Sequence, residues 1–310
     1  ISVLAEKFGV DTTSDVAAGL FRPSPSFAGP SADITKQWMR DSYKHWDDLH
    51  TNVDSSLAGV CQISGYIFSR KSADIVKNHH MENVVHTYRR ASEEELGLCE
   101  GGWKYGSYFV TLLTDCGLYL PYALKKFREA GGIVNHEKVR SFGELSGRFD
   151  VVVNCSGLGA RELCNDLNVV PVRGQVIKVK APWIKMAFYS ENDTYIIPGF
   201  RSVTLGGCYE SNNFNTTPCD VVKREIRERC CNMLPSLKRS EFLCERVGLR
   251  PYRNIVRVEP ETVLCSTGKQ LKVIHNYGHG GYGVTTAPGT AMHAVKLARN
   301  MHSASNKSKL

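Results

Sequence analysis

The stretch HNYGHGGYGVTTAPGTAMHAVKLA, residues 275–298, decides the fold class of this chain. Its glycines are Gly278, Gly280, Gly281 and Gly283. They follow the strand-like run LKVIHNY and precede a helical pattern that we expect to begin at about Pro288. Glycines in this place let the backbone lie against a flat ligand, and the helix N-terminus offers it N–H groups and positive charge. Four glycines in six positions exceed what a tight turn requires, so the pattern favours contact with a ligand.

The glycine spacing by itself does not predict an independent NAD site. Gly278, Gly280 and Gly283 match the GxGxxG pattern of dinucleotide-binding loops. Such a loop also needs an acidic residue about 20 positions later to hold the ribose, and Glu261 is the last acidic residue of the chain. A second glycine turn, GLGARE, has Glu162 where the third Gly or Ala should stand. A NAD-linked dehydrogenase is therefore the least favoured class.

The order of strand-like and helix-like segments predicts an α/β fold. The amphipathic pattern of residues 115–132 leads into strand patterns at 133–139 and 149–155, which form a nucleotide-binding layer together with 270–298. Three segments rich in Val, Ile and Tyr predict a separate sheet. They are VRGQVIKVKAPW (172–183), TYIIPGF (194–200) and SVTLGGCY (202–209). We expect a Rossmann-like domain built from separated pieces and interleaved with a substrate domain that contains a mixed β-sheet.

The domain boundaries follow from this alternation. We assign residues 1–22, 113–170 and 255–310 to the discontinuous nucleotide-binding domain. We assign residues 23–112 and 171–254 to the substrate-binding domain. The pattern of residues 23–106 is the hardest to interpret.

The composition is typical of a globular protein, with 42% hydrophobic and 23% charged residues and a net charge of +8. The Lys and Arg residues are scattered, and no apolar run approaches the roughly 18 residues of a membrane span, so we expect neither nucleic-acid nor membrane binding. Eleven cysteines without a CxxC pair favour reduced thiols, and we predict no metal site. Ser308, Lys309 and Leu310 form the address SKL, which predicts an import receptor as partner and the peroxisomal matrix as location.

The chain resembles the FAD-dependent D-amino-acid oxidases. Four blocks carry the resemblance: DTTSDVAAGL (11–20), VVVNCSGLGARELC with VVPVRGQVIKVKAPW (151–183), TYIIPG with VTLGG (194–207), and VGLRPYRNIVRVE with VIHNYGHGGYGVTT (247–286). The family oxidises D-amino acids with O2 to the 2-oxo acid, ammonia and H2O2, by hydride transfer to flavin N5 and without a protein acid or base. The second block is similar to the aspartate-oxidising branch. The resemblance also implies that roughly thirty residues, with the first strand of the FAD-binding domain, precede Ile1.

The resemblance implies which residues contact FAD. Glu6 would hold the adenosine ribose at the end of a strand, Val139 would meet the adenine, and Ser156 follows on the next strand. The other implied contacts are Thr12, Thr13, Ser14, Ala18, Gly19 and Leu20 in a first loop, and Gly280, Gly281, Tyr282, Gly283, Val284 and Thr285 in a second. The flat ligand of the opening stretch would then be the flavin ring.

The resemblance also implies how the substrate binds. Arg250 would bind the α-carboxylate, Tyr195 would hydrogen-bond the same group, and the Gly281 carbonyl would accept from the α-amino group. Glu191 stands four residues before Tyr195, where the neutral-substrate enzymes have a second lid tyrosine. Arg22 is either a second cation for an acidic side chain or a solvated loop residue.

Three functions stay open. The first is oxidation of acidic D-amino acids, D-aspartate and D-glutamate, and the second is oxidation of neutral D-amino acids. The third is an inactive binding protein, because the first FAD-binding strand is absent from the printed sequence. The sequence is compatible with a monomer or a homo-oligomer.

Overall fold

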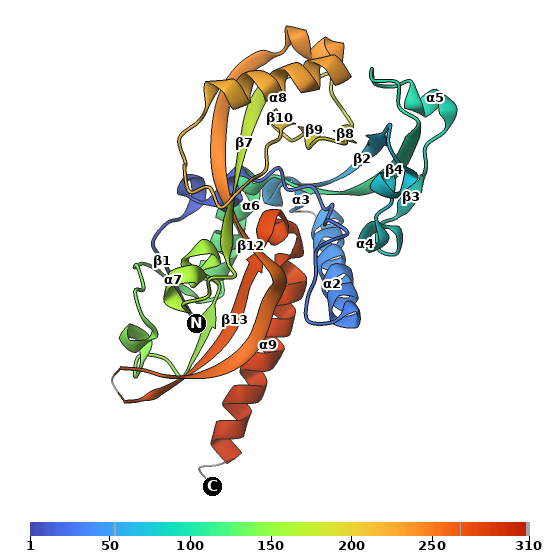
Figure 1. Ribbon diagram of the computed structural model, residues 1–310. Coiled ribbons are helices and arrows are strands. Elements are labelled where there is room, and N and C mark those ends of the chain that lie inside the picture. The colour runs from blue at the N-terminus through green and yellow to red at the C-terminus, as the bar shows by residue number, and fades with distance from the viewer. Residues whose placement is uncertain (53, 267, 308–310) are drawn as a thin grey trace.

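The computed structural model describes residues 1–52, 54–266 and 268–307. An 11-stranded mixed sheet extends through the molecule in the order β3-β4-β2-β8-β9-β10-β7-β12-β13-β6, with β11 beside β7 (Figure 1). A second sheet pairs β1 with β5 in parallel. The α/β fold class with an interleaved mixed sheet is confirmed, whereas the domain boundaries stay a prediction.

The bounds of the elements are as follows. The strands are β1 (Ser2–Ala5), β2 (Val60–Ser69), β3 (Thr87–Arg90), β4 (Tyr105–Thr114), β5 (Ile133–His136), β6 (Val151–Asn154), β7 (Val170–Lys180), β8 (Ala187–Ser190), β9 (Thr194–Pro198), β10 (Val203–Gly206), β11 (Glu210–Ser211), β12 (Glu241–Leu264) and β13 (Gln270–His279). The α-helices are α1 (Thr13–Val16), α2 (Ala32–His50), α3 (Ser55–Ala58), α4 (His79–Glu82), α5 (Glu93–Leu96), α6 (Cys116–Glu129), α7 (Ala160–Leu163), α8 (Asp220–Met233) and α9 (Gly283–Lys307). Short 3-10 turns include η4 (Gly157–Gly159) and η6 (Gly280–Tyr282).

The strand, glycine loop and helix of the opening stretch are present, but the predicted start of the helix is wrong. β13 pairs antiparallel with β12 and parallel with β6, and η6 connects it directly to α9. The helix begins at Gly283, and Pro288 lies inside it. Thr286 Oγ1 donates to the Tyr282 carbonyl at 2.7 Å and supports this first turn. Proline is favoured in the first turn of a helix, which is why the pattern suggested a later start.

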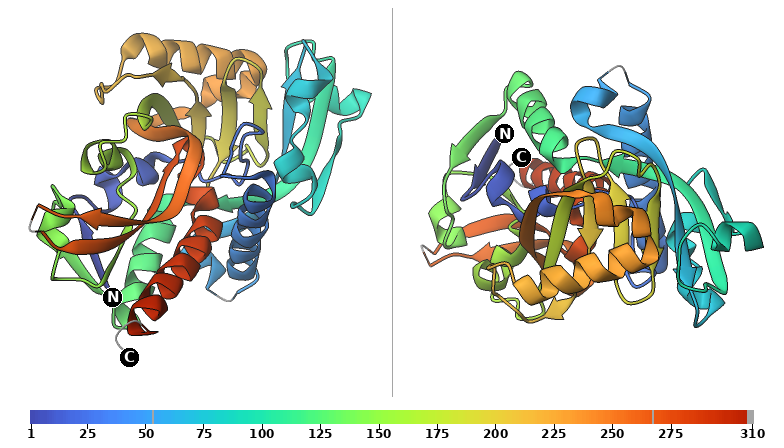
Figure 2. Two further views of the ribbon diagram at one scale, coloured as in Figure 1. Left: turned by 60° about the horizontal axis from the view of Figure 1, so that its bottom comes forward. Right: turned by 90° about the horizontal axis from the view of Figure 1, so that it is seen from above.

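Helix α9 is held in place by α2, which lies along it (Figure 2, left). A Cβ atom on Gly289 would stand 2.1 Å from the Trp38 carbonyl oxygen, so only glycine allows the two helices to approach this closely. Ser42 Oγ donates to Thr286 O at 3.0 Å and accepts from Gly289 N at 2.9 Å. Trp46 Nε1 donates to Thr285 O at 2.9 Å. The N-terminal part of α9 is thereby fixed next to the main core.

Two hydrophobic clusters lie on opposite faces of the large sheet. The first cluster includes Leu20, Trp38, Trp46, Leu113 and Ile197 and lies beneath α2 and α9. The second joins the other face of β7, β9 and β10 to α8, which covers that face in Figure 1. In the part of the chain that the structure describes, no helix combines the length and apolarity needed to cross a membrane.

Candidate active site

Arg250 lies where β12, β7 and the glycine loop meet. β12 pairs with β7, and a Cβ on Gly174 of β7 would stand 2.4 Å from the Arg250 guanidinium carbon, so glycine lets the guanidinium lie flat on the strand. A Cβ on Gly281 would stand 3.2 Å from Arg250 Cδ, which places the side chain against the exposed backbone of the loop. Arg250 Nη1 donates to Cys208 O at 3.0 Å. Among the described residues no Asp or Glu pairs with Arg250, so its guanidinium is available to an external carboxylate.

Tyr195 in β9 lies beside Arg250. Its phenol ring lies over the Gly206–Gly207 backbone, where a Cβ on Gly206 would stand 2.0 Å from the ring carbon Cζ. Burial raises the pKa of Tyr195, and the nearby positive charge of Arg250 acts against that rise. The phenol therefore stays protonated at neutral pH and can donate a hydrogen bond to a group bound at Arg250.

Tyr189 in β8 also lies at the candidate site, although no motif of the sequence pointed to it. Tyr189 is the cross-strand partner of Tyr195, and the two ring centres are 5.7 Å apart. The guanidinium carbon of Arg22 lies 4.2 Å from the centre of the Tyr189 ring. The position of Tyr189, six residues before Tyr195, carries no signal until the β8–β9 register is known. A second tyrosine thus lies beside Tyr195, but it comes from position 189 and not from position 191.

Glu191 points away from the candidate site. Its carboxylate is 5% exposed and accepts hydrogen bonds from Ser69 Oγ at 2.8 Å, Arg70 N at 3.1 Å and Arg70 Nε at 3.2 Å. Burial by itself would raise the pKa of Glu191, but the hydrogen bonds from Ser69 and Arg70 outweigh burial and lower it. Glu191 therefore fixes the β8–β9 turn to the end of β2 and does not face a substrate at Arg250.

The two loops assigned to the flavin meet in one cluster. Leu20 is buried in the first hydrophobic cluster, and Ala18, Tyr195, Tyr282 and Val284 pack against the same cluster. Gly19 has φ +68°, and its carbonyl accepts from Thr114 N at 2.9 Å, so this loop is fixed to β4. Thr285, the last residue assigned to the second loop, donates its hydroxyl to Tyr282 O at 3.2 Å.

Glycine is favoured at the individual positions of the second loop for different physical reasons. Gly278 and Gly280 have φ values of +94° and +59°, which a side chain would strain. Gly281 makes room for Arg250. Gly283 has helical backbone angles, and a Cβ there would meet only His279 Cβ at 3.6 Å, so nothing in the described chain requires glycine. An open backbone face at the start of α9 fits a flat ligand such as a flavin ring.

Thr12, Thr13 and Ser14 lie at the start of α1, next to β12. Thr12 Oγ1 donates to Gly9 O at 2.7 Å, and Thr13 Oγ1 donates to Leu249 O at 3.3 Å. A Cβ on Gly248 would stand 3.1 Å from Thr13 Cγ2, so the loop lies close to the strand that carries Arg250. The loop that contains Thr12, Thr13 and Ser14 is thus a neighbour of β12, the strand that carries Arg250.

Glu6, Val139 and Ser156 lie in the parallel-strand part of the molecule. Glu6 directly follows β1, is exposed, and its Oε1 lies 3.2 Å from Lys138 Nζ. Val139, Leu4 and Val152 all pack against a buried cluster around Phe142 and Val273, so β1 and β6 share a small core. Ser156 is exposed beyond the end of β6, and its Oγ donates to Asn154 Oδ1 at 2.7 Å.

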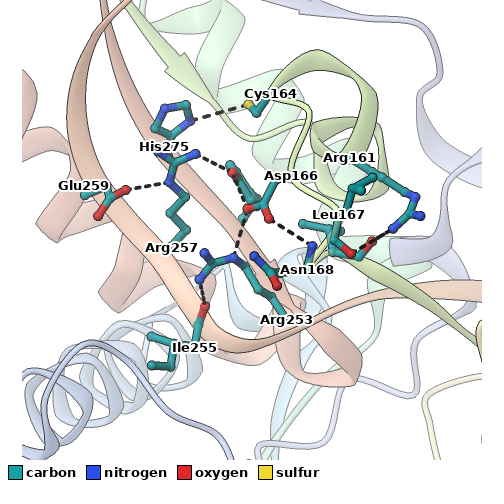
Figure 3. Close-up of polar contacts among 12 residues, drawn as sticks. Arg161, Cys164, Asp166, Leu167, Asn168, Arg253, Ile255, Arg257, Glu259 and His275 are labelled. Atoms are coloured by element: carbon teal, nitrogen blue, oxygen red, sulfur yellow. Dashed lines mark hydrogen bonds and ion pairs between the residues drawn. The ribbon is translucent and has the colours of Figure 1, made fainter.

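A polar network holds the segment after the second glycine turn against β12 and β13 (Figure 3). Asp166 accepts from Tyr277 Oη at 2.9 Å, Arg253 Nε at 3.0 Å and Asn168 N at 3.1 Å. Burial alone would raise the pKa of Asp166, but the Tyr277 hydrogen bond and the Arg253 charge lower it. Arg257 Nη1 donates to Tyr277 Oη at 2.8 Å and extends the network.

A separate cleft of about 300 Å³ contains none of the predicted site residues. It lies between β2, the end of β7 and the β9–β10 turn. Lys180, Lys185 and Arg201 are among its lining residues.

Comparison with known proteins identifies the family and agrees with the fold. The family model described as FAD dependent oxidoreductase matches residues 2–297. The chain is 38% identical to D-aspartate oxidase of Homo sapiens, over 96% of this chain and 86% of that protein. It is 36% identical to D-amino acid oxidase of Dugesia ryukyuensis, over 97% and 90%, and 40% identical to D-amino-acid oxidase of Streptomyces coelicolor, over 93% and 85%.

Solved structures agree at the level of the fold. Glycine oxidase from Geobacillus kaustophilus superposes with a TM-score of 0.75 and 16% identity, covering 96% of this chain and 88% of that one. L-proline dehydrogenase from P. horikoshii gives 0.73 at 14% identity, covering 94% and 85%. From the family model and the sequence relatives, the chain belongs to the FAD-dependent oxidoreductases of the D-amino-acid oxidase family.

Proposed function

We propose that the protein is a FAD-dependent oxidase that deaminates acidic D-amino acids to 2-oxo acid, ammonia and H2O2. The observation that carries the proposal is the Arg250 guanidinium, which lies against Gly281 and beside Tyr195 without a carboxylate partner in the described chain. The similarity to D-aspartate oxidase supports an acidic substrate. The comparable similarity to D-amino-acid oxidases supports the alternative, a neutral substrate.

The chain's own residues position the substrate. Arg250 binds the α-carboxylate, and the Tyr195 hydroxyl donates to the same group. The Gly281 carbonyl accepts a hydrogen bond from the α-amino group and favours the neutral amine, which is the form that is oxidised. None of these residues transfers a proton, so we expect no acid or base catalyst from the protein.

FAD fits the residues present on the other side of this site. Ala18 to Leu20 and Gly280 to Thr285 would hold the flavin, with the open face of Gly283 toward it. Thr12, Thr13 and Ser14 would contact the ribose and diphosphate, and Glu6, Val139 and Ser156 the adenosine end. FAD, when bound, accepts the substrate Cα hydride and passes the electrons to O2. The N–H groups at the start of α9 direct positive charge toward this site.

Replacement of Arg250 tests the proposal. We expect Arg250→Met to lower kcat/KM for the best D-amino acid by about 30–100-fold, because a bidentate charge-assisted pair contributes roughly 2–3 kcal/mol once water is excluded. H2O2 release on D-Asp and D-Ala measures this, and the flavin absorbance checks that cofactor is retained. Arg250→Lys is the matched control, since it keeps the charge and loses the planar fork, and we expect intermediate activity. Unchanged kcat/KM in Arg250→Met would refute the role.

A peroxisomal location stays a prediction. Ser308, Lys309 and Leu310 lie outside the described residues, and so does any contact with an import receptor. The distribution of a fluorescent fusion with and without these three residues tests the signal, and identical distributions would contradict it.

A further inference from the structure

Arg22 is a cation held among aromatic side chains without an acidic partner in the described chain. Phe21 N donates to Leu112 O at 2.8 Å, and Asn78 Nδ2 donates to Pro23 O at 2.8 Å, so the backbone is fixed on both sides of Arg22. The guanidinium stacks on the Tyr189 ring. Arg22 Nε is buried and has no hydrogen-bond partner among the described residues. The Nε atom of Arg22 is therefore shielded from water, although the residue as a whole is partly exposed.

Stacking leaves part of the Arg22 guanidinium uncompensated. The ring contact acts on the face of the guanidinium, whereas its N–H groups donate from the edge. A buried N–H without an acceptor, and a charge withdrawn from water without a counter-ion, are both unfavourable. Glu82 is the acidic residue whose field, like that of Arg22, acts on Tyr88, but Glu82 is exposed and makes no ion pair with Arg22. The chemical group that satisfies a guanidinium edge best is a carboxylate.

Arg22 and Arg250 lie beside two neighbouring tyrosines. Tyr189 contacts Arg22 and pairs with Tyr195, and Tyr195 lies beside Arg250. Burial raises the pKa of Tyr189, and the Arg22 charge acts against that rise. Burial likewise raises the pKa of Tyr209, and the Arg250 charge opposes it. Because Tyr189 and Tyr195 are cross-strand partners, Arg22 and Arg250 each lie beside one member of the same tyrosine pair.

We propose that Arg22 binds the side-chain carboxylate of the substrate while Arg250 binds its α-carboxylate, so that acidic D-amino acids are the preferred class. The inference rests on the proposed oxidase function and specifies the substrate of that same site. Arg22 supplies this second positive charge from a segment far from Arg250 in the sequence.

Isosteric pairs of substrates isolate the contribution of charge. The wild-type protein, Arg22→Met and Arg22→Lys, each loaded with FAD, are compared on D-Asp against D-Asn and on D-Glu against D-Gln. Met is unbranched and uncharged and replaces only the apolar stem of the arginine, and Lys keeps the charge. We expect Arg22→Met to lower kcat/KM for D-Asp by about 30-fold or more while D-Asn changes less than about threefold. Arg22→Lys is expected to retain part of the D-Asp preference.

A binding measurement accompanies the kinetics. Succinate and butanoate differ by one carboxylate, and their dissociation constants are read from the perturbation of the flavin absorbance. We expect the wild-type preference for succinate to disappear in Arg22→Met. An equal loss on D-Asp and D-Asn, or an unchanged preference for succinate, would overturn the proposal.

The test also separates the inference from the oxidase function. If the FAD-loaded wild type releases no H2O2 from any of these amino acids, the proposed function fails. In that case a succinate preference that depends on Arg22 would still support the carboxylate subsite.

Discussion

At the residue scale, Gly283 is the most informative position of the loop that is proposed to bind the flavin. The described chain does not require glycine there, because the backbone is helical and a Cβ would meet only His279 Cβ at 3.6 Å. Gly278 and Gly280, by contrast, need their positive φ angles, and Gly281 is needed by Arg250. Gly283 is therefore the position at which the proposed flavin contact can be tested without disturbing the fold.

We therefore expect Gly283→Ala to separate folding from cofactor binding. The apoprotein should be as stable as the wild type or up to about 1 kcal/mol more stable, because alanine favours a helix over glycine. FAD affinity should fall by about tenfold or more, because a methyl group would occupy space next to the flavin ring, at a cost typical of small overpacking. Fluorescence titration with FAD and apoprotein thermal unfolding measure the two effects. An unchanged FAD dissociation constant would place the flavin elsewhere.

At the element scale, Asp166 joins the segment after α7 to β12 and β13. Its carboxylate is 8% exposed and is bound by Arg253 and Tyr277, which belong to those two strands. This contact fixes the glycine turn beside Ser156 relative to the strands that lead to Arg250 and the flavin loop. The connection acts on stability, because Asp166 contacts none of the residues assigned to the substrate.

We expect Asp166→Asn to lower the free energy of unfolding by about 2–4 kcal/mol, because it leaves Arg253 partly buried with a weaker acceptor. The pKa of Asp166 is lowered in the folded protein, so its contribution is complete above the ordinary Asp pKa of about 3.9 and is lost as the pH falls through the folded-state pKa. Urea unfolding at pH 7 and at successively lower pH measures both. The control is Asp150→Asn, an exposed carboxylate without an ion pair among the described residues. Equal effects of the two variants would contradict the prediction.

At the scale of the whole molecule, the proposed FAD site joins distant parts of the chain. Leu20 near the N-terminus, Tyr195 in the large sheet and Tyr282 before α9 all contact one hydrophobic cluster. A ligand bound between such segments stabilises the folded state, because the unfolded chain does not bind it. We expect FAD at 100 times its dissociation constant to add about 2.7 kcal/mol and to raise Tm by about 5 °C.

Differential scanning calorimetry with and without FAD measures this stabilisation, and ATP serves as an adenine nucleotide without a flavin. A colourless protein whose Tm does not respond to FAD would favour the alternative of an inactive binding protein. A response to FAD without H2O2 release would separate cofactor binding from the proposed reaction.

The amino-acid sequence by itself determined the local features of this protein. Alternating Val and Ile predicted β7, the amphipathic run with Gly131 after it predicted α6, and the glycines after LKVIHNY predicted the loop before α9. Arg250 and Tyr195 were assigned by matching family blocks, and the structure places the two side chains together. The predictions of β7, α6 and the loop before α9 succeed because periodicity and turn chemistry are properties of short stretches of chain, whereas the roles of Arg250 and Tyr195 stay predictions.

Only the tertiary structure decided which side chains share the site. In the sequence, Glu191 stands where the neutral-substrate enzymes have a second lid tyrosine. In the structure, the turn after β8 directs Glu191 to Ser69, and the strand register places Tyr189 opposite Tyr195. Likewise the role proposed for Arg22 depends on its contact with Tyr189, a residue 167 positions away in the chain. Register and long-range packing are set by the sum of many contacts across the sheet, and no local pattern encodes that sum.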